Sequence, residues 1–109
     1  MKDLTFTQMQ AYLAAKYEEK ATSSGLFIKL VEEVGEVAEA LNCLEGRKKD
    51  SGDASLEKEL TDVIHYAVAI ASINQIDLTH VILEKDQDAA AKYNHSPNLV
   101  EFLRKEGRG

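Results

Sequence analysis

The chain has 109 residues, of which 44% are hydrophobic and 29% are charged, as in one small globular domain, and we expect that domain to span residues 1–109. A net charge of −6 disfavours a nucleic acid polymer as the partner, because phosphate backbones repel an acidic protein. The single cysteine excludes a disulfide within the chain, and no stretch reaches the length of a membrane span or a secretory h-region. We therefore expect a cytoplasmic protein that does not bind membranes.

The first predicted helix opens with a capping box at Thr5–Gln8 and ends near Lys20. Its apolar residues recur at helical spacing, at Phe6, Met9, Leu13 and Tyr17. Residues 21–25 follow as a short polar linker, and the serines in this linker are suited to cap the next helix.

The second predicted helix, from about Leu26 to Glu45, carries a cluster of carboxylates: Glu32, Glu33, Glu36 and Glu39. Glu32 and Glu36 are separated by one helical turn, so they repel each other by roughly a few tenths of a kcal/mol. Lys29 reaches Glu32 or Glu33 but not the whole set. A hard divalent cation would offset the remaining charge, because such ions prefer oxygen ligands.

A plain amphipathic helix is the alternative explanation of this cluster. Its apolar face consists of Phe27, Leu30, Val31, Val34, Val37, Ala38 and Leu41. Glu32, Glu36 and Glu39 lie roughly opposite, so periodicity alone favours a solvated acidic surface over a metal site. Gly35 slightly favours a functional site over a plain amphipathic helix. A glycine inside a helix costs about 1 kcal/mol relative to alanine and indicates close approach of another element or a ligand.

Residues 46–53 form a charged loop between the second and third helices. The pair Asp50 and Asp53 is too sparse for a calcium-binding loop. The basic run 47–49 is better explained by the helix dipole, which favours cations at a helix C-terminus, than by a phosphate site.

The third predicted helix, from about Ser55 to Asn74, is apolar around nearly its whole circumference, at Val63, Ile64, Ala67, Val68, Ala69, Ile70, Ala71 and Ile73. Such a helix is expected to be buried on more than one side. Glu59, Asp62 and Tyr66 form a stripe at the edge of this surface, where unpaired carboxylates are costly without a cation or a proton. A single bundle would leave part of Val68, Ile70 or Ile73 exposed, which predicts a homodimer.

The fourth predicted helix runs from Leu78 to about Tyr93, with Asp77 as its cap and Lys85 within its apolar stripe. Ser96–Pro97 is expected to open a short fifth helix. The sequence therefore predicts an all-α fold, an antiparallel four-helix-type bundle with a short extra C-terminal helix, completed by dimerisation. His65, His80 and His95 have no spacing typical of metal ligands.

Taken together, Glu32-Glu33-x-x-Glu36 and Glu59-x-x-Asp62 resemble the EExxE…ExxD signature of the MazG-like, all-α nucleoside triphosphate pyrophosphohydrolases. The resemblance extends over most of the second to fourth helices. It implies a homodimer or a dimer-of-dimers tetramer that uses Mg²⁺, with Mn²⁺ as a substitute. It also implies cleavage of a (deoxy)nucleoside triphosphate to the monophosphate and pyrophosphate, as in nucleotide-pool housecleaning.

The same resemblance implies roles for individual residues. The metal ligands would be Glu33, Glu36, Glu59 and Asp62. Glu32 would be catalytic, holding a further ion or orienting the attacking water. The substrate-binding residues would be Tyr66, Lys85 and Lys92. The sequence departs from the family pattern at Ala89, where many members have an asparagine that contacts the nucleotide, so the identity of the substrate stays open.

Two other functions are compatible with the sequence. Phosphoribosyl-ATP pyrophosphohydrolase belongs to the same superfamily and has a similar acidic pattern, and turnover of phosphoribosyl-ATP alone would favour it. A non-enzymatic helical interaction module is the alternative from another class, and it should show no stabilisation by Mg²⁺.

Overall fold

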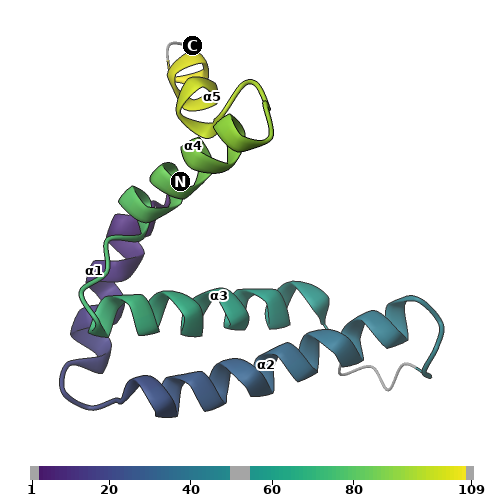
Figure 1. Cartoon of the computed structure of the whole chain (residues 1–109). Coiled ribbons are helices and arrows are strands. Elements are labelled where there is room, and N and C mark those ends of the chain that lie inside the picture. Colours follow the sequence, from purple (N-terminus) through teal and green to yellow (C-terminus); the bar gives the residue numbers. More distant parts are fainter. Residues whose placement is uncertain (1–2, 50–54, 108–109) are drawn as a thin grey trace. The chain divides into compact units, whose positions relative to one another are not determined.

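The computed structural model describes residues 3–49 and 55–107, and in this part of the chain it contains five helices and no strands (Figure 1). They are α1 (Phe6–Tyr17), α2 (Ser23–Leu44), α3 (Leu56–Ile73), α4 (Leu78–Lys92) and α5 (Leu99–Glu106). The predicted all-α fold with a short fifth helix is confirmed. Dimerisation stays a prediction.

The chain divides into two compact units, Met1–Gln75 and Ile76–Gly109. The first contains α1, α2 and α3, and the second contains α4 and α5. The expectation of a single domain over residues 1–109 stays a prediction. Among the described residues no single helix is long and apolar enough to cross a membrane, and only α3 and α4 counted together reach that length and composition.

Side-chain caps define where the first two helices begin. Thr5 Oγ1 accepts a hydrogen bond from the Gln8 backbone N–H at 3.1 Å, and Gln8 Oε1 accepts from the Thr5 N–H at 2.9 Å, so the predicted capping box is confirmed. Thr22 caps α2 by accepting from the Gly25 N–H at 3.0 Å. The prediction that the linker serines cap this helix was wrong, because the Thr22 hydroxyl satisfies the free N–H first and the serines lie in the first turn.

The C-terminal end of α2 is closed by a glycine in the left-handed region. Gly46 has φ +79°, and it donates to the Cys43 carbonyl at 3.2 Å while Arg47 donates to the Asn42 carbonyl at 2.8 Å. This Schellman arrangement satisfies two carbonyls that the helix leaves free. The predicted loop begins here, and its Asp50 and Asp53 lie outside the described residues.

Helices α2 and α3 run antiparallel along each other (Figure 1). The Asn74 side chain at the end of α3 donates to the Ser23 hydroxyl at the start of α2, at 2.8 Å. Between positions 26 and 41 of α2, the buried and half-buried residues follow one stripe at helical spacing: Leu26, Leu30, Glu33, Val37, Ala40 and Leu41. This stripe is the face of α2 that packs on α3.

The apolar arc of α2 is wider than α3 can cover. Phe27, Ile28, Val31 and Val34 remain 52–60% exposed, and we call these four residues the α2 strip. Part of the apolar face predicted for this helix is therefore not covered within the described chain. A Cβ at Gly35 would meet no described atom within 4 Å apart from its chain neighbours and the backbone of its own helix, so the close approach expected at this glycine is not made within the described chain.

Helix α3 is the centre of the first unit because α2 packs on one side and α1 on another. Val68, Ala69, Ala71 and Ser72 are buried, as is Leu13 of α1. The Ser72 hydroxyl donates to the Gln10 carbonyl at 3.1 Å and joins the two helices. Burial on more than one side is thus confirmed for the second half of α3. The predicted partial exposure is wrong for Val68, which is buried, whereas Ile70 and Ile73 are half-buried. The large apolar residues of α3 that are exposed are Leu60 and Ile64.

In the second unit, α4 and α5 pack on each other. Asp77 caps α4 as predicted, accepting from the His80 N–H at 3.3 Å. The cap of α5 is Asn98, which forms a capping box with Glu101, so the prediction that Ser96–Pro97 opens this helix was wrong. The physical reason is that the amide of Asn98 and the carboxylate of Glu101 satisfy each other's backbone N–H groups. Asp86 also accepts from the Leu99 N–H, at 2.6 Å.

Candidate metal centre

Three carboxylates from two helices converge in the first unit. Glu33 comes from α2, and Glu59 and Asp62 come from α3. Each offers one oxygen, and these oxygens lie within 4.8 Å of one another. All three side chains are half-buried. We call Glu33, Glu59 and Asp62 the carboxylate trio.

Helical spacing explains why these positions meet. Glu33 lies on the stripe of α2 that faces α3, between the apolar neighbours Leu30 and Val37 of that stripe. Glu59 and Asp62 are three residues apart on α3, and residues at this spacing lie on the same side of a helix. The antiparallel packing of α2 on α3 therefore directs all three carboxylates to one place.

The trio is electrostatically unfavourable when it holds no cation. The pKa of Glu33 is raised above its ordinary value, first by burial and then by the charges of Asp62 and Glu59. A hydrogen bond with Asp62 and the charge of Glu36 raise it further. Among the described residues no lysine, arginine or histidine forms an ion pair with the trio. A proton or a bound cation is thus the available compensation.

The donor set fits a hard divalent cation. Mg²⁺ binds oxygen at about 2.1 Å in an octahedron, so two of its ligands lie about 3 Å apart when adjacent and about 4 Å apart when opposite. The oxygens of the trio all lie within 4.8 Å of one another, and small rotations of the half-buried side chains suffice to bring them to these separations. With only three protein oxygens, positions would remain for water and for phosphate oxygens.

The other two acids of the predicted site, Glu32 and Glu36, lie outside the trio. Glu36 is exposed on the next turn of α2, although its charge still raises the pKa of Glu33. Glu32 is exposed and its carboxylate lies 3.5 Å from the ammonium of Lys29. The structure thus brings together three of the four predicted metal ligands, and the roles of Glu36 and Glu32 stay predictions.

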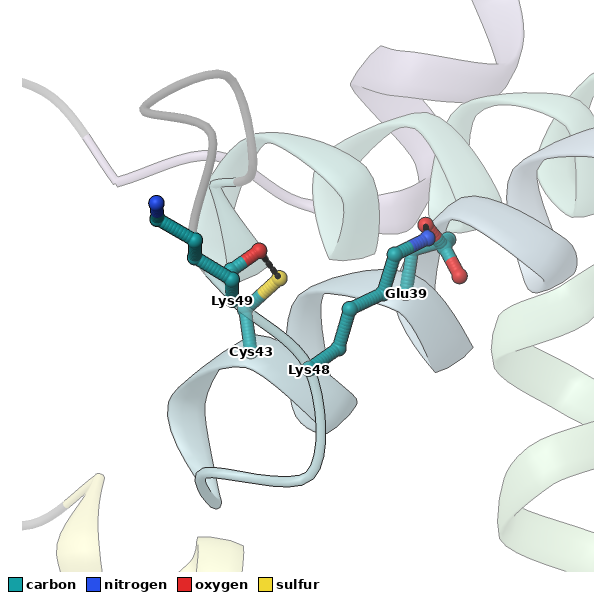
Figure 2. Close-up of polar contacts among 4 residues, drawn as sticks. All are labelled: Glu39, Cys43, Lys48 and Lys49. Atoms are coloured by element: carbon teal, nitrogen blue, oxygen red, sulfur yellow. Dashed lines mark hydrogen bonds and ion pairs between the residues drawn. The ribbon is translucent and has the colours of Figure 1, made fainter.

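The fourth acid of α2, Glu39, is paired at the end of the helix. Figure 2 shows Lys48 reaching back to its carboxylate, while the thiol of Cys43 donates to the Lys49 carbonyl at 3.8 Å. Glu39 has its own counter-charge and does not belong to the trio. Cys43 is a half-buried residue within this local structure.

An aromatic group adjoins the trio on α3. Tyr66 follows Asp62 by one turn and is half-buried, and its ring meets His65 edge to face with centroids 4.8 Å apart. The Tyr17 hydroxyl of α1 and Nε2 of His65 share a hydrogen bond of 2.7 Å. Burial lowers the pKa of His65, and Lys16 lowers it further, so the imidazole is mostly neutral near pH 7. His65 is a packed residue, in agreement with its lack of a metal-ligand spacing.

The predicted substrate-binding lysines belong to the second unit. Lys85 and Lys92 line a pocket of about 400 Å³ on α4, together with Val81, Glu84, Asp88, Ala89 and Tyr93. Both lysines lie on one face of the helix, and Ala89 lies between them. Their contact with a nucleotide stays a prediction.

Another pocket, of about 360 Å³, lies on α3 beside the trio. It is lined by Glu57, Lys58, Thr61 and Asp62. Lys58 and Thr61 are not among the site residues predicted from the sequence. The spacing of Lys58, one helical turn before Asp62, was the signal that could have found it.

Half-buried carboxylates that converge from two antiparallel helices form a donor set typical of helical proteins that bind divalent cations through oxygen ligands. Comparison with known protein families identifies the family of this chain. The family model described as the MazG nucleotide pyrophosphohydrolase domain matches residues 21–95. The match covers more than half of the chain, so the chain belongs to the MazG nucleotide pyrophosphohydrolase family, which are hydrolases that act on phosphoanhydride bonds. No match was found among curated proteins.

Proposed function

We propose that this protein is a Mg²⁺-dependent pyrophosphohydrolase that converts a (deoxy)nucleoside triphosphate to the monophosphate and pyrophosphate. Membership of the MazG family supports the type of reaction. The single observation that carries the metal dependence is the convergence of Glu33, Glu59 and Asp62. Mn²⁺ should substitute for Mg²⁺, because both accept carboxylate and water oxygens. Removal of unwanted triphosphates from the nucleotide pool is the corresponding role.

In this proposal the acidic residues of the first unit have different roles. The trio holds the cation, which when bound neutralises the charge that builds on the phosphoryl oxygens. Glu32 is exposed beside Glu33 and orients the attacking water, from which it accepts a proton. The water oxygen forms the new bond to phosphorus, and the bond to the departing pyrophosphate breaks in line. Glu36 adds a ligand from the next turn of α2.

We assign the contacts with the nucleotide to Tyr66, Lys85 and Lys92. The half-buried ring of Tyr66 offers an apolar surface one turn from Asp62. Lys85 and Lys92 are exposed cations on one face of α4 and suit phosphate oxygens. Because Ala89 cannot donate a hydrogen bond, selection of the base depends on other residues.

We also propose a homodimer, or a dimer of two dimers, in which the α2 strip is covered. Four large apolar side chains that are more than half exposed on one side of a helix form a surface typical of a protein interface. A nucleic acid polymer is not a partner in this proposal, since the net charge of −6 opposes it.

A substrate screen tests the proposed reaction. All common and modified nucleoside triphosphates, together with phosphoribosyl-ATP, are incubated with the protein, and pyrophosphate release is measured with Mg²⁺, with Mn²⁺ and with a chelator. We expect release from at least one triphosphate that requires a divalent cation. Turnover of phosphoribosyl-ATP alone, or release that survives the chelator, would contradict the proposal.

A further inference from the structure

The pocket beside the trio has a lysine among its lining residues, and no ion pair of this lysine is formed with the described residues. The pocket is lined by Glu57, Lys58, Thr61 and Asp62, so Lys58 is the basic residue among its lining side chains. Within residues 3–49 and 55–107, Lys58 makes no ion pair. Lys29 and Lys48, in contrast, are paired with Glu32 and Glu39 of α2.

Lys58 lies next to a predicted metal ligand, because it precedes Asp62 by one turn of α3. Residues one helical turn apart lie side by side, with Cβ atoms about 5–6 Å apart. A ligand in this pocket therefore meets the ammonium of Lys58 next to a carboxylate that belongs to the trio. Thr61 does not compete for the same ligand, because its hydroxyl donates to the Glu57 carbonyl at 2.8 Å.

We propose that Lys58 binds a phosphoryl oxygen of the substrate's triphosphate and of the pyrophosphate product, in the pocket that it shares with Asp62. This inference rests on the proposed function and adds a substrate-binding residue to it. The carboxylates of Glu57 and Asp62 repel a bare anion, so the ligand enters together with a divalent cation. The ammonium then donates a charge-assisted hydrogen bond to an oxygen that the cation does not take.

Binding of inorganic pyrophosphate tests the inference without turnover. Titration calorimetry on the full chain, with saturating Mg²⁺, compares the wild type with Lys58→Gln and Lys58→Arg. We expect Lys58→Gln to weaken pyrophosphate binding about tenfold, as the loss of one hydrogen bond between charged groups implies, and Lys58→Arg to retain most of the affinity. Lys48→Gln is the matched control, because it removes another exposed lysine, which is paired with Glu39, and it should bind like the wild type.

Several results would overturn the inference. If Lys58 only balances the charge of nearby acids, Lys58→Gln should bind Mg²⁺ more tightly and pyrophosphate unchanged. A wild type that does not bind pyrophosphate with Mg²⁺ would also exclude it, and thermal melting of each variant shows whether it is folded. The proposed reaction is judged separately, by pyrophosphate release from triphosphates. If the protein releases pyrophosphate from triphosphates and Lys58→Gln leaves pyrophosphate binding unchanged, only the role of Lys58 is excluded. If pyrophosphate binding depends on Lys58 but no triphosphate is cleaved, only the proposed reaction is excluded.

Discussion

Glu33 on α2 and Asp62 on α3 hold carboxylate oxygens within 4.8 Å of each other. The charge of Asp62 is one of the causes that raise the pKa of Glu33. The fold thus places two carboxylates so close together that ionising both of them is unfavourable. A bound cation removes this conflict, and so does a proton. We therefore expect a neutral side chain at position 33 to stabilise the metal-free protein.

The first prediction concerns Glu33→Gln. The amide keeps the shape of the side chain and removes its charge, so the metal-free variant should be as stable as the wild type or more stable. The rise in melting temperature that Mg²⁺ produces in the wild type should be lost, because binding to the native state is the source of that rise. Thermal melting with and without Mg²⁺ measures both effects.

Glu39→Gln is the control for this experiment, since Glu39 lies on the same helix and pairs with Lys48 (Figure 2). Its melting temperature should still rise with Mg²⁺. Identical behaviour of Glu33→Gln and Glu39→Gln would show that the trio is only surface charge, and the enzyme mechanism proposed above would be wrong.

The second prediction concerns the trio as a unit. Glu59→Gln and Asp62→Asn should each lower pyrophosphate release at least about 100-fold, because even residues that only support a metal ligand are worth about 10–100-fold. The double variant should be scarcely worse than either single one, since ligands of one ion fail together. Losses that multiply in the double variant would mean that the two residues act independently.

The third prediction concerns pH. The folded pKa of Glu33 is raised above its ordinary value of 4.5, so its protonated form stabilises the metal-free protein. This contribution is complete below pH 4.5 and is lost as the pH rises through the raised pKa. The advantage of Glu33→Gln over the wild type in melting temperature should therefore grow with pH across this range and then level off.

The affinity for Mg²⁺ should rise with pH over the same interval, because the metal binds the deprotonated carboxylate. Calorimetric titrations at several pH values measure this dependence. A wild-type affinity that is constant from pH 4.5 to 7 would contradict the assignment of Glu33 as a ligand.

The fourth prediction concerns the hydrogen bond between Tyr17 and His65, which joins α1 to α3. Tyr17→Phe should lower the free energy of unfolding by about 1–2 kcal/mol, because a half-buried imidazole nitrogen loses its partner. Urea unfolding measures the change. Tyr12→Phe is the matched control on the same helix, since Tyr12 is 63% exposed, and it should cost much less. Equal losses would show that the hydrogen bond does not stabilise the fold.

The fifth prediction concerns the α2 strip. Val31→Gln, in the middle of the strip, should shift the protein from dimer to monomer, because it places a polar amide in an apolar interface. Light scattering at micromolar concentration measures the mass. Leu44→Gln is the control, since Leu44 is also an exposed apolar residue of α2 but lies on a different side of the helix. A wild type with the 12.1 kDa mass of one chain would exclude the dimer.

The sequence by itself predicted the five helices and identified the acids among which the trio lies. Side-chain caps such as Thr5 and Asp77 act within one helical turn, and the apolar periodicity is local as well, so both could be predicted without a fold. The spacing of the acids on α2 and α3 likewise identified the family that the domain match confirms.

Only the tertiary structure decided which acids meet. Glu33 and Glu36 are neighbours on α2, and the sequence placed both in one ligand set, but the packing stripe of α2 turns Glu33 toward α3 and leaves Glu36 exposed. The contact between Tyr17 and His65 was equally beyond sequence reasoning, because it depends on how α1 crosses α3. The exposure of the α2 strip has the same origin. An apolar face predicts that a helix packs against another element. How much of that face one neighbouring helix can cover depends on how the two helices pack together in three dimensions.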